Sequence, residues 1–321
     1  MTPEFKITAG GEDITQRLNN RLLGLVVTDE AGWVSDSLTI TLDNRGEELT
    51  TPTRGERLSV SLGYKGSSLE NMGDFIVDEV EHAFPPAQLI IRGRSANTFD
   101  GGIGDLKAPR FKSWHDTTYD KIANAIAGGH GLSTEVCAEI ASIEIDHIDQ
   151  TGESDIAFLN RIVEDAGGFV KVAGGKLIIS EHDGFEIPPL VLKTQDITSW
   201  RCRIAERGKY GSVKARYYDR KAGEEKIITE GSGEPVFRLP FRYASATTAQ
   251  RAARAKLERL EQGIHTLEIC AIGNPIISTE TPLAVVGVST YVNGAWVAGS
   301  CTHRLDASGY TTTINATKRR P

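Results

Sequence analysis

Apolar and polar side chains form short runs along the first hundred residues, and each run ends at turn residues. The clearest run is 37–42, where Leu38, Ile40 and Leu42 share one face, as expected for a half-buried strand. Similar short runs predict further strands at 22–28, 57–64, 75–80 and 88–93. Five or six short strands at this spacing favour a small barrel or sandwich.

A helical period replaces this pattern in the middle of the chain. We expect Asp116 to cap a helix that runs to about Ala127, and Ser154 to cap a second helix. The apolar stripes comprise Tyr119, Ile122, Ala123 and Ile126 in the first helix, and Ile156, Leu159, Ile162, Val163 and Ala166 in the second. A hairpin is expected next, at 169–179, so this block is predicted to be α+β.

Strands return after residue 188, and one helix interrupts them. The strands are expected at 212–218, 226–229, 266–270, 284–288 and 311–314. The helix is expected at about 247–262, because Thr247-x-x-Gln250 has the spacing of a capping box. Its apolar stripe comprises Ala249, Ala252, Ala253, Leu257 and Leu260.

This order of elements predicts an α+β, mainly β fold: two small β-barrel domains with an intervening α+β block. We expect the first barrel at 1–104, the α+β domain at 105–187, and the second barrel, with its inserted helix, at 188–321. A composition of 39% hydrophobic and 25% charged residues excludes a disordered chain. No apolar run approaches the roughly 18 residues that a membrane-spanning helix needs, so no membrane span is expected.

Charge is distributed unevenly, although the net charge is only −7. Residues 1–200 hold 17 Lys and Arg against 32 Asp and Glu, a balance of −15. Residues 201–321 hold 19 against 11, a balance of +8. Such a division is typical either of a nucleic-acid-binding face or of an assembly whose copies dock through opposite fields.

The segment 201–226 concentrates the basic charge. It holds nine Lys and Arg against four acidic residues, with tyrosines between them, and such a mixture can bind single-stranded nucleic acid. However, strand alternation places Lys214 and Arg216 on one face, as on the wet side of any sheet, which favours a solvated or partner-facing surface. The candidate subunit or partner interface comprises Arg201, Arg203, Arg207, Lys209, Lys214 and Arg216.

Three histidines are the candidates for a metal site. If His115, His130 and His147 converged, they could bind a metal, but their spacing matches no zinc motif. We also expect His147 to face away from both neighbouring acids, Asp146 and Asp149. Structural or surface histidines are therefore favoured, and no metal is expected.

The sequence contains no recognisable catalytic motif. It lacks a Gly-x-Ser-x-Gly nucleophile elbow and a phosphate-binding Gly-Lys-Ser/Thr loop. Its four cysteines form no Cys-x-x-Cys pair, so we expect free thiols in a reducing compartment. No enzyme activity, no catalytic residue and no cofactor are expected.

Three stretches together resemble one protein family. They are Ser113-Trp-His-Asp-Thr-Thr118, His147-Ile-Asp-Gln-Thr-Gly-Glu-Ser-Asp-Ile-Ala-Phe-Leu159, and Gly294-Ala-Trp-Val297 leading to His303-Arg-Leu-Asp306. They resemble the late control D proteins of contractile-tailed temperate phages and of contractile bacteriocins such as pyocins. The alanine-rich helix at 247–262 is also typical of that family.

The resemblance implies a structural role as a baseplate hub, related to the hub part of type VI secretion spike proteins. In that family the hub is a homotrimer with two similar barrels per subunit, and the ring adapts the sixfold tail tube to the threefold central spike. The implied partners are further copies of the chain, the central spike protein, the tail tube or tube-initiator protein, and other baseplate proteins. The chain would be made in the bacterial cytoplasm and assembled into a virion tail, a prophage-encoded tail or a bacteriocin particle. A nucleic-acid-binding protein that uses 201–226 is the alternative.

Overall fold

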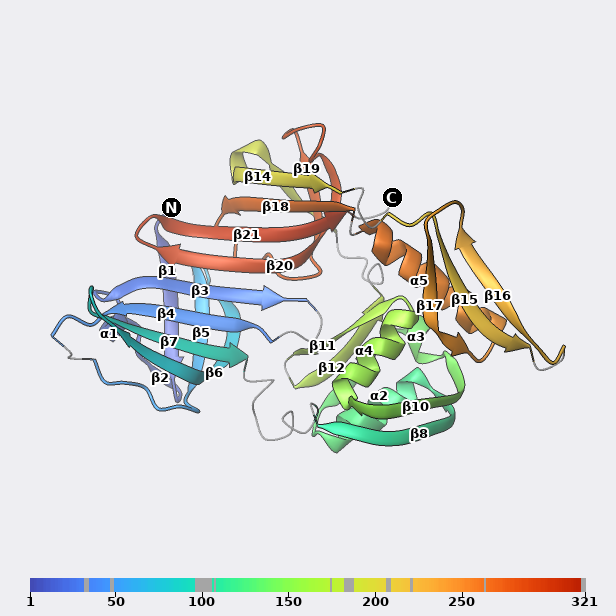
Figure 1. Cartoon of the computed structure of the whole chain (residues 1–321). Helices are drawn as coiled ribbons and strands as arrows, with labels where there is room; N and C mark the ends of the chain where they lie inside the picture. The colour runs from blue at the N-terminus through green and yellow to red at the C-terminus, as the bar shows by residue number, and fades with distance from the viewer. Residues whose placement is uncertain are drawn as a thin grey trace. The chain divides into compact units, whose positions relative to one another are not determined.

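The chain folds into two compact units, each made of segments that are distant in sequence (Figure 1). The computed structural model describes residues 1–31, 35–46, 49–95, 106, 108–173, 175–181, 188–205, 209–219, 222–262 and 264–318. The β unit comprises Met1–Asp100, Pro188–Cys202 and Leu267–Pro321, and the mixed unit comprises Gly101–Ile187 and Arg203–Thr266. The expected second β-region, 188–321, is therefore shared between the two units.

The β unit consists almost entirely of strands. Its N-terminal elements are β1 (Pro3–Ala9), β2 (Glu12–Asp13), α1 (Thr15–Leu18), β3 (Leu22–Glu30), β4 (Ser37–Asp43), β5 (Arg57–Tyr64), β6 (Glu70–Ala83) and β7 (Gln88–Ser95). Its later elements are β13 (Leu190–Lys193), the 3-10 helix η3 (Thr194–Asp196), β14 (Ile197–Ile204), β18 (His265–Ile272), β19 (Pro282–Val286), β20 (Gly294–Asp306) and β21 (Gly309–Lys318). These thirteen strands belong to one continuous sheet.

Strand β20 joins the early and late parts of this sheet. β21 pairs along one edge of β20, and the other edge pairs with β19 through residues 294–297 and with β3 through residues 300–306 (Figure 1). The ladder between β20 and β3 is antiparallel. A strand from the end of the chain thus completes a sheet that begins with the first hundred residues.

Two apolar cores lie within the β unit. The first β-core includes Val60 and Phe75, and the second β-core includes Ile269. Strand β20 contributes to both, because Trp296 lies in the second β-core and Leu305 lies in the first. The alternation that predicted β4 is confirmed, with all three of its apolar residues buried.

The mixed unit combines helices with three small sheets. Its first part contains β8 (Pro109–Thr118), α2 (Tyr119–Gly129), β9 (Ser133–Val136), α3 (Ala138–Ala141), β10 (Glu144–Ser154), α4 (Asp155–Asp165), β11 (Gly168–Ala173) and β12 (Lys176–Glu181). Its second part contains β15 (Ser212–Asp219), β16 (Glu224–Gly231), β17 (Val236–Tyr243) and α5 (Ala246–Gln262). The sheets are the two-stranded ribbon of β8 and β10, the sheet β11-β12-β9, and the sheet β16-β15-β17.

The predicted stripes of α2 and α4 are buried, and they form the main core of the mixed unit. Ser154 caps α4 as predicted, accepting a hydrogen bond of 3.2 Å from the backbone N–H of Ala157. The prediction that Asp116 caps α2 is wrong. Asp116 lies within β8 at a φ of 43°, and the cap is Thr118, which directly precedes the helix.

Helix α5 begins slightly earlier than its predicted capping box. Ser245 and Thr248 exchange hydrogen bonds: the N–H of Thr248 donates to the Ser245 hydroxyl over 3.2 Å, and the N–H of Ser245 donates to the Thr248 hydroxyl over 3.1 Å. The predicted box at Thr247 and Gln250 is therefore wrong by two residues. The alanines of the predicted stripe are buried, and its two leucines, Leu257 and Leu260, pack against them.

The mainly β, α+β fold class is confirmed, and every strand expected from the sequence is present. Nine strands in the described part of the chain were not predicted: β1, β2, β8, β9, β10, β13, β14, β17 and β20. The closure of each β-core into a barrel and the three-domain division stay predictions, and the boundary at 104 lies outside the described residues. Each helix in the described part of the chain is too short or too polar to span a bilayer.

Candidate functional site

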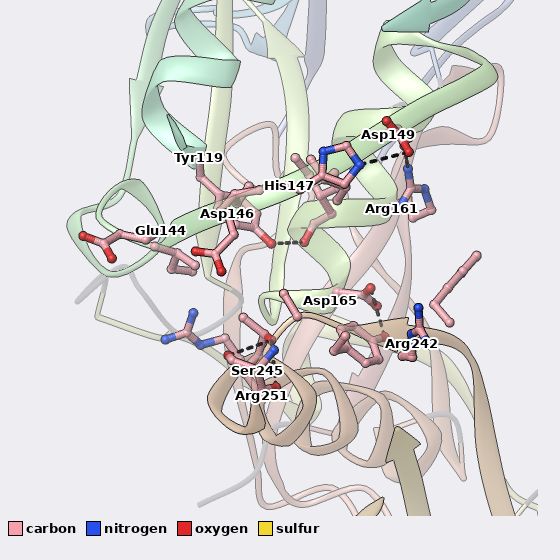
Figure 2. Close-up of a pocket in the computed structure, with 18 of the residues that line it drawn as sticks. Tyr119, Glu144, Asp146, His147, Asp149, Arg161, Asp165, Arg242, Ser245 and Arg251 are labelled. Atoms are coloured by element: carbon pink, nitrogen blue, oxygen red, sulfur yellow. Dashed lines mark hydrogen bonds and ion pairs between the residues drawn. The ribbon is translucent and has the colours of Figure 1, made fainter. Parts of the chain in front are cut away.

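A pocket of about 640 Å³ lies in the mixed unit, among β10, α4, β17 and the start of α5 (Figure 2). Seven consecutive residues, 143–149, line it. Because side chains alternate along a strand, a consecutive run means that the edge of β10 borders the pocket. In the described chain, β8 is the sheet partner of β10, so alternate backbone N–H and C=O groups of β10 point away from that partner. Such an edge can pair with an extended polypeptide segment.

Two phenols and one carboxyl, of which Tyr119 is buried and Tyr243 and Asp165 are half-buried, line the inner part of this pocket. The hydroxyl of Tyr243 donates to Asp165 over 3.1 Å, and the hydroxyl of Tyr119 donates to the carbonyl of Ile162 over 3.0 Å. Burial raises the pKa of Asp165 and of both phenols, although the bond from Tyr243 partly offsets this for the carboxyl. The tyrosines therefore stay protonated near neutral pH and serve as hydrogen-bond donors.

Arg161 ties α4 to the ribbon. Its guanidinium donates to both carboxylate oxygens of Glu153, over 2.5 and 3.2 Å, and to the backbone oxygen of Asp149 over 2.9 Å. Figure 2 shows Arg161 beside Asp149 on the pocket rim. Sequence reasoning missed this residue. The i, i+8 spacing of Glu153 and Arg161 spans a strand end and two helical turns, which no short motif describes.

A chain of polar side chains lies on the exposed face of the ribbon. The Ser113 hydroxyl donates to Asp149 over 2.6 Å, Asp149 lies 3.2 Å from Nε2 of His147, and Nδ1 of His147 lies 3.0 Å from Nδ1 of His115. The bond from Ser113, and secondarily His147, lowers the pKa of Asp149. The expectation that His147 faces away from Asp149 is wrong, because residues two apart in a strand share a face.

The third histidine lies elsewhere, in a buried network. His130 Nε2 is 2.9 Å from one carboxylate oxygen of Asp155, and the Gln150 amide donates to the other over 2.8 Å. Arg110 forms an ion pair of 3.1 Å with the same carboxylate. His130 therefore does not converge with His115. Within the described ranges, no group of three or more His, Cys, Asp or Glu is arranged to hold a metal.

The predicted basic interface residues are spread over both units. Arg201 and Arg203 both lie on β14, near whose end the boundary between the two units falls, whereas Lys209, Lys214 and Arg216 belong to the mixed unit. On β15, Lys214 and Arg216 alternate with the buried Val213 and Ala215. Arg207 lies outside the described residues.

The aromatic residues of this segment are mostly engaged in packing. Tyr210 meets Phe237 edge to face at 5.2 Å, and Tyr217 packs against the core under α5. Tyr218 is exposed, with the guanidinium of Arg242 5.8 Å from its ring. These contacts do not support the nucleic-acid alternative.

The four cysteines, all within the described residues, form no disulfide.

Comparisons with known proteins agree on one kind of molecule. A family model described as "Phage tail baseplate hub (GPD)" matches residues 105–309. A "Probable baseplate hub protein" of Escherichia phage 186 is 32% identical over 97% of this chain and 92% of its own length. Its namesake in Escherichia phage P2 is 33% identical over 98% and 92%.

A solved structure has the same fold. The crystal structure of the 43 kDa tail protein of prophage MuSo2 from Shewanella oneidensis superimposes with a TM-score of 0.74, covering 99% of this chain and 98% of that one. The two sequences are 16% identical, so this likeness concerns the fold alone.

Proposed function

Since this chain belongs to the phage tail baseplate hub family, we propose that it forms a homotrimeric ring that adapts the sixfold tail tube to the threefold central spike. The chain is a structural component of a contractile-tail baseplate. The observation that carries the proposal is the pair of β-cores on one sheet in the β unit. Three subunits with two β-cores each present six similar lobes to the tube, while the ring keeps threefold symmetry for the spike.

A closed ring of identical subunits needs a heterologous interface, in which two different patches of the chain meet. Strand β14 offers one such patch. It ends the sheet path in the described part of the chain, next to β18, and it exposes Trp200, Arg201, Arg203 and Ile204. Exposed apolar and basic side chains on a sheet edge favour a partner surface. The excess acidic charge of residues 1–200 makes the acidic surface of the next copy its complement.

Oligomeric state and binding test this proposal. Native mass spectrometry is expected to give three times the chain mass of 34.9 kDa, and the trimer is expected to co-purify with the spike protein and with the tube or tube-initiator protein. A chain that stays monomeric and retains neither partner would contradict it.

The interface itself has a separate test. The double variant Trp200→Ala/Arg201→Glu is expected to lower the trimer fraction, whereas Lys121→Glu, on the exposed face of α2, leaves it unchanged. A double variant that remains fully trimeric would exclude β14 from the interface without excluding the trimer.

The proposed role is structural, without catalysis or a cofactor. The chain would be made in the bacterial cytoplasm and assembled with other baseplate proteins. The same hub would serve a phage virion, a prophage-encoded tail or a phage-tail-like bacteriocin such as a pyocin.

A further inference from the structure

Two histidines face each other across the β8–β10 ribbon. His115 and His147 are direct cross-strand partners, and their ring centroids are 4.5 Å apart. Their Nδ1 atoms approach to 3.0 Å. Both side chains are exposed, so the space beside the two nitrogens is open to ions from solution.

Asp149 decides which nitrogen of His147 carries the proton. Its carboxylate accepts, so the Nε2 atom of His147, 3.2 Å away, is the donor. Ser113 donates to the same carboxylate over 2.6 Å and holds it in place. The Nδ1 atom of His147 therefore presents a lone pair toward His115. A carboxylate behind a histidine is also the arrangement that orients histidine ligands in metal sites.

We propose that His115 and His147 form a two-imidazole chelate for a borderline divalent transition-metal ion, such as Cu²⁺, Ni²⁺ or Zn²⁺. Imidazole nitrogens suit these metals, whereas Mg²⁺ and Ca²⁺ require oxygen ligands. Two metal–nitrogen bonds of about 2.0–2.1 Å at a tetrahedral angle place the nitrogens about 3.3 Å apart. To bind the ion, the two Nδ1 atoms separate by a few tenths of an ångström and the two rings turn, so that both lone pairs point at the ion.

Binding requires no net loss of protons. Without metal, the Nδ1–H of His115 donates to Nδ1 of His147. When the ion takes that place, His115 carries its proton on Nε2 instead, and both Nδ1 lone pairs ligate. Water fills the remaining coordination positions, since the site is exposed.

This chelate differs from a three-histidine centre, because His130 lies in the buried network with Asp155. Its consequence is a cross-link within the ribbon. In the described chain, β8 and β10 are sheet partners only of each other, so an ion bound to both strands holds them in register.

Metal titration of the full chain, purified without a histidine tag, tests the proposal. Equilibrium dialysis with Ni²⁺ or Cu²⁺ is expected to show about one bound equivalent in the native chain, and none with Mg²⁺. His115→Ala and His147→Ala are expected to lose it, whereas His82→Ala, at an exposed position on β6, keeps it. Asp149→Asn is expected to weaken binding about tenfold, the lower end for such supporting residues.

Electron paramagnetic resonance of the native chain with Cu²⁺ gives a readout that does not depend on whether variants fold. Coupling to two imidazole nitrogens is the expected result. A native chain that binds no transition metal, a spectrum with fewer than two nitrogens, or binding that survives loss of either histidine would overturn the proposal. Unchanged affinity in Asp149→Asn would overturn the positioning role of Asp149.

Discussion

The β unit and the mixed unit each bury a histidine, but they give it different partners. In the β unit, Nε2 of the fully buried His303 donates to the carbonyl of Ile277 over 2.9 Å, and Nδ1 accepts from Tyr310 over 2.9 Å. In the mixed unit, His130 meets the carboxylate of Asp155. The first histidine has neutral partners and the second has an ionisable one.

This difference follows from how each unit is held together. The strands of the β unit are joined by the backbone hydrogen bonds of one continuous sheet. The side chain of His303 on β20 therefore needs only neutral hydrogen-bond partners and does not have to link separate elements. The mixed unit divides its strands among three sheets. Its buried carboxylate links the end of α2, through His130, to the start of α4 and, through Gln150, to the ribbon. In the mixed unit, side-chain hydrogen bonds thus connect elements that no common sheet joins.

The largest expected effect is in the mixed unit. Asp155→Ala removes the acceptor shared by His130 and Gln150, and leaving such buried groups poorly paired costs about 2–4 kcal/mol. Urea denaturation followed by circular dichroism measures this loss. Glu135→Ala is the matched control, because Glu135 pairs with Lys176 at the surface, where an ion pair contributes about 1 kcal/mol or less. Equal losses in the two variants would contradict the linking role of Asp155.

A smaller effect is expected in the β unit at Gly273. A Cβ at this position would overlap the ring of Tyr310, the residue that donates to His303. Gly273→Ala therefore forces the ring to move, and such overpacking costs about 1–3 kcal/mol. The melting temperature measures the loss. Gly128→Ala in α2 is the control, because nothing lies within 4 Å of the added Cβ, and it is expected to be neutral or slightly stabilising.

The smallest effect is a dependence of stability on pH. Burial lowers the pKa of His303 below its usual 6.5, so the unfolded chain takes up a proton at a higher pH than the folded chain does. The contribution of His303 is therefore complete above pH 6.5, and it is lost as the pH falls toward the folded pKa, at up to about 1.4 kcal/mol per pH unit. Denaturation between pH 5 and pH 7.5 measures the slope, and His303→Gln is expected to reduce it. Equal slopes in both proteins would show that His303 does not titrate as described.

Local patterns predicted what depends on local physics. The stripe and cap of α4 follow from Ser154 and the helical period, and β4 and β5 in the first β-core follow from alternation. Strands β8 and β10 were missed because their exposed positions do not alternate regularly with buried ones. The two strands also pair with each other across a long stretch of sequence, so no local pattern indicates the ladder.

The candidate site depended on such distant pairings, so the sequence predicted it only in part. The sequence identified His115 and His147 as candidate metal ligands. It did not predict that the two are cross-strand neighbours, because that depends on the register between β8 and β10. The network of Asp155 was not predicted, because 25 residues separate it from His130. That network gives a physical reason for the most recognisable stretch of the chain. Between Gln150 and Leu159 lie a buried amide, a helix cap and a buried carboxylate.

The position of β20 in the sheet also sets the order in which the chain can fold during synthesis. The edge of β3 acquires its partner only when residues 300–306 leave the ribosome, more than 250 residues later. The segments of the mixed unit are made in the meantime, so this unit can fold before the β unit is complete. Until β20 arrives, β3 presents an open edge on which another nascent chain can pair. Completion of the hub therefore depends on its last two strands, and a chain truncated before β20 is expected to aggregate rather than assemble.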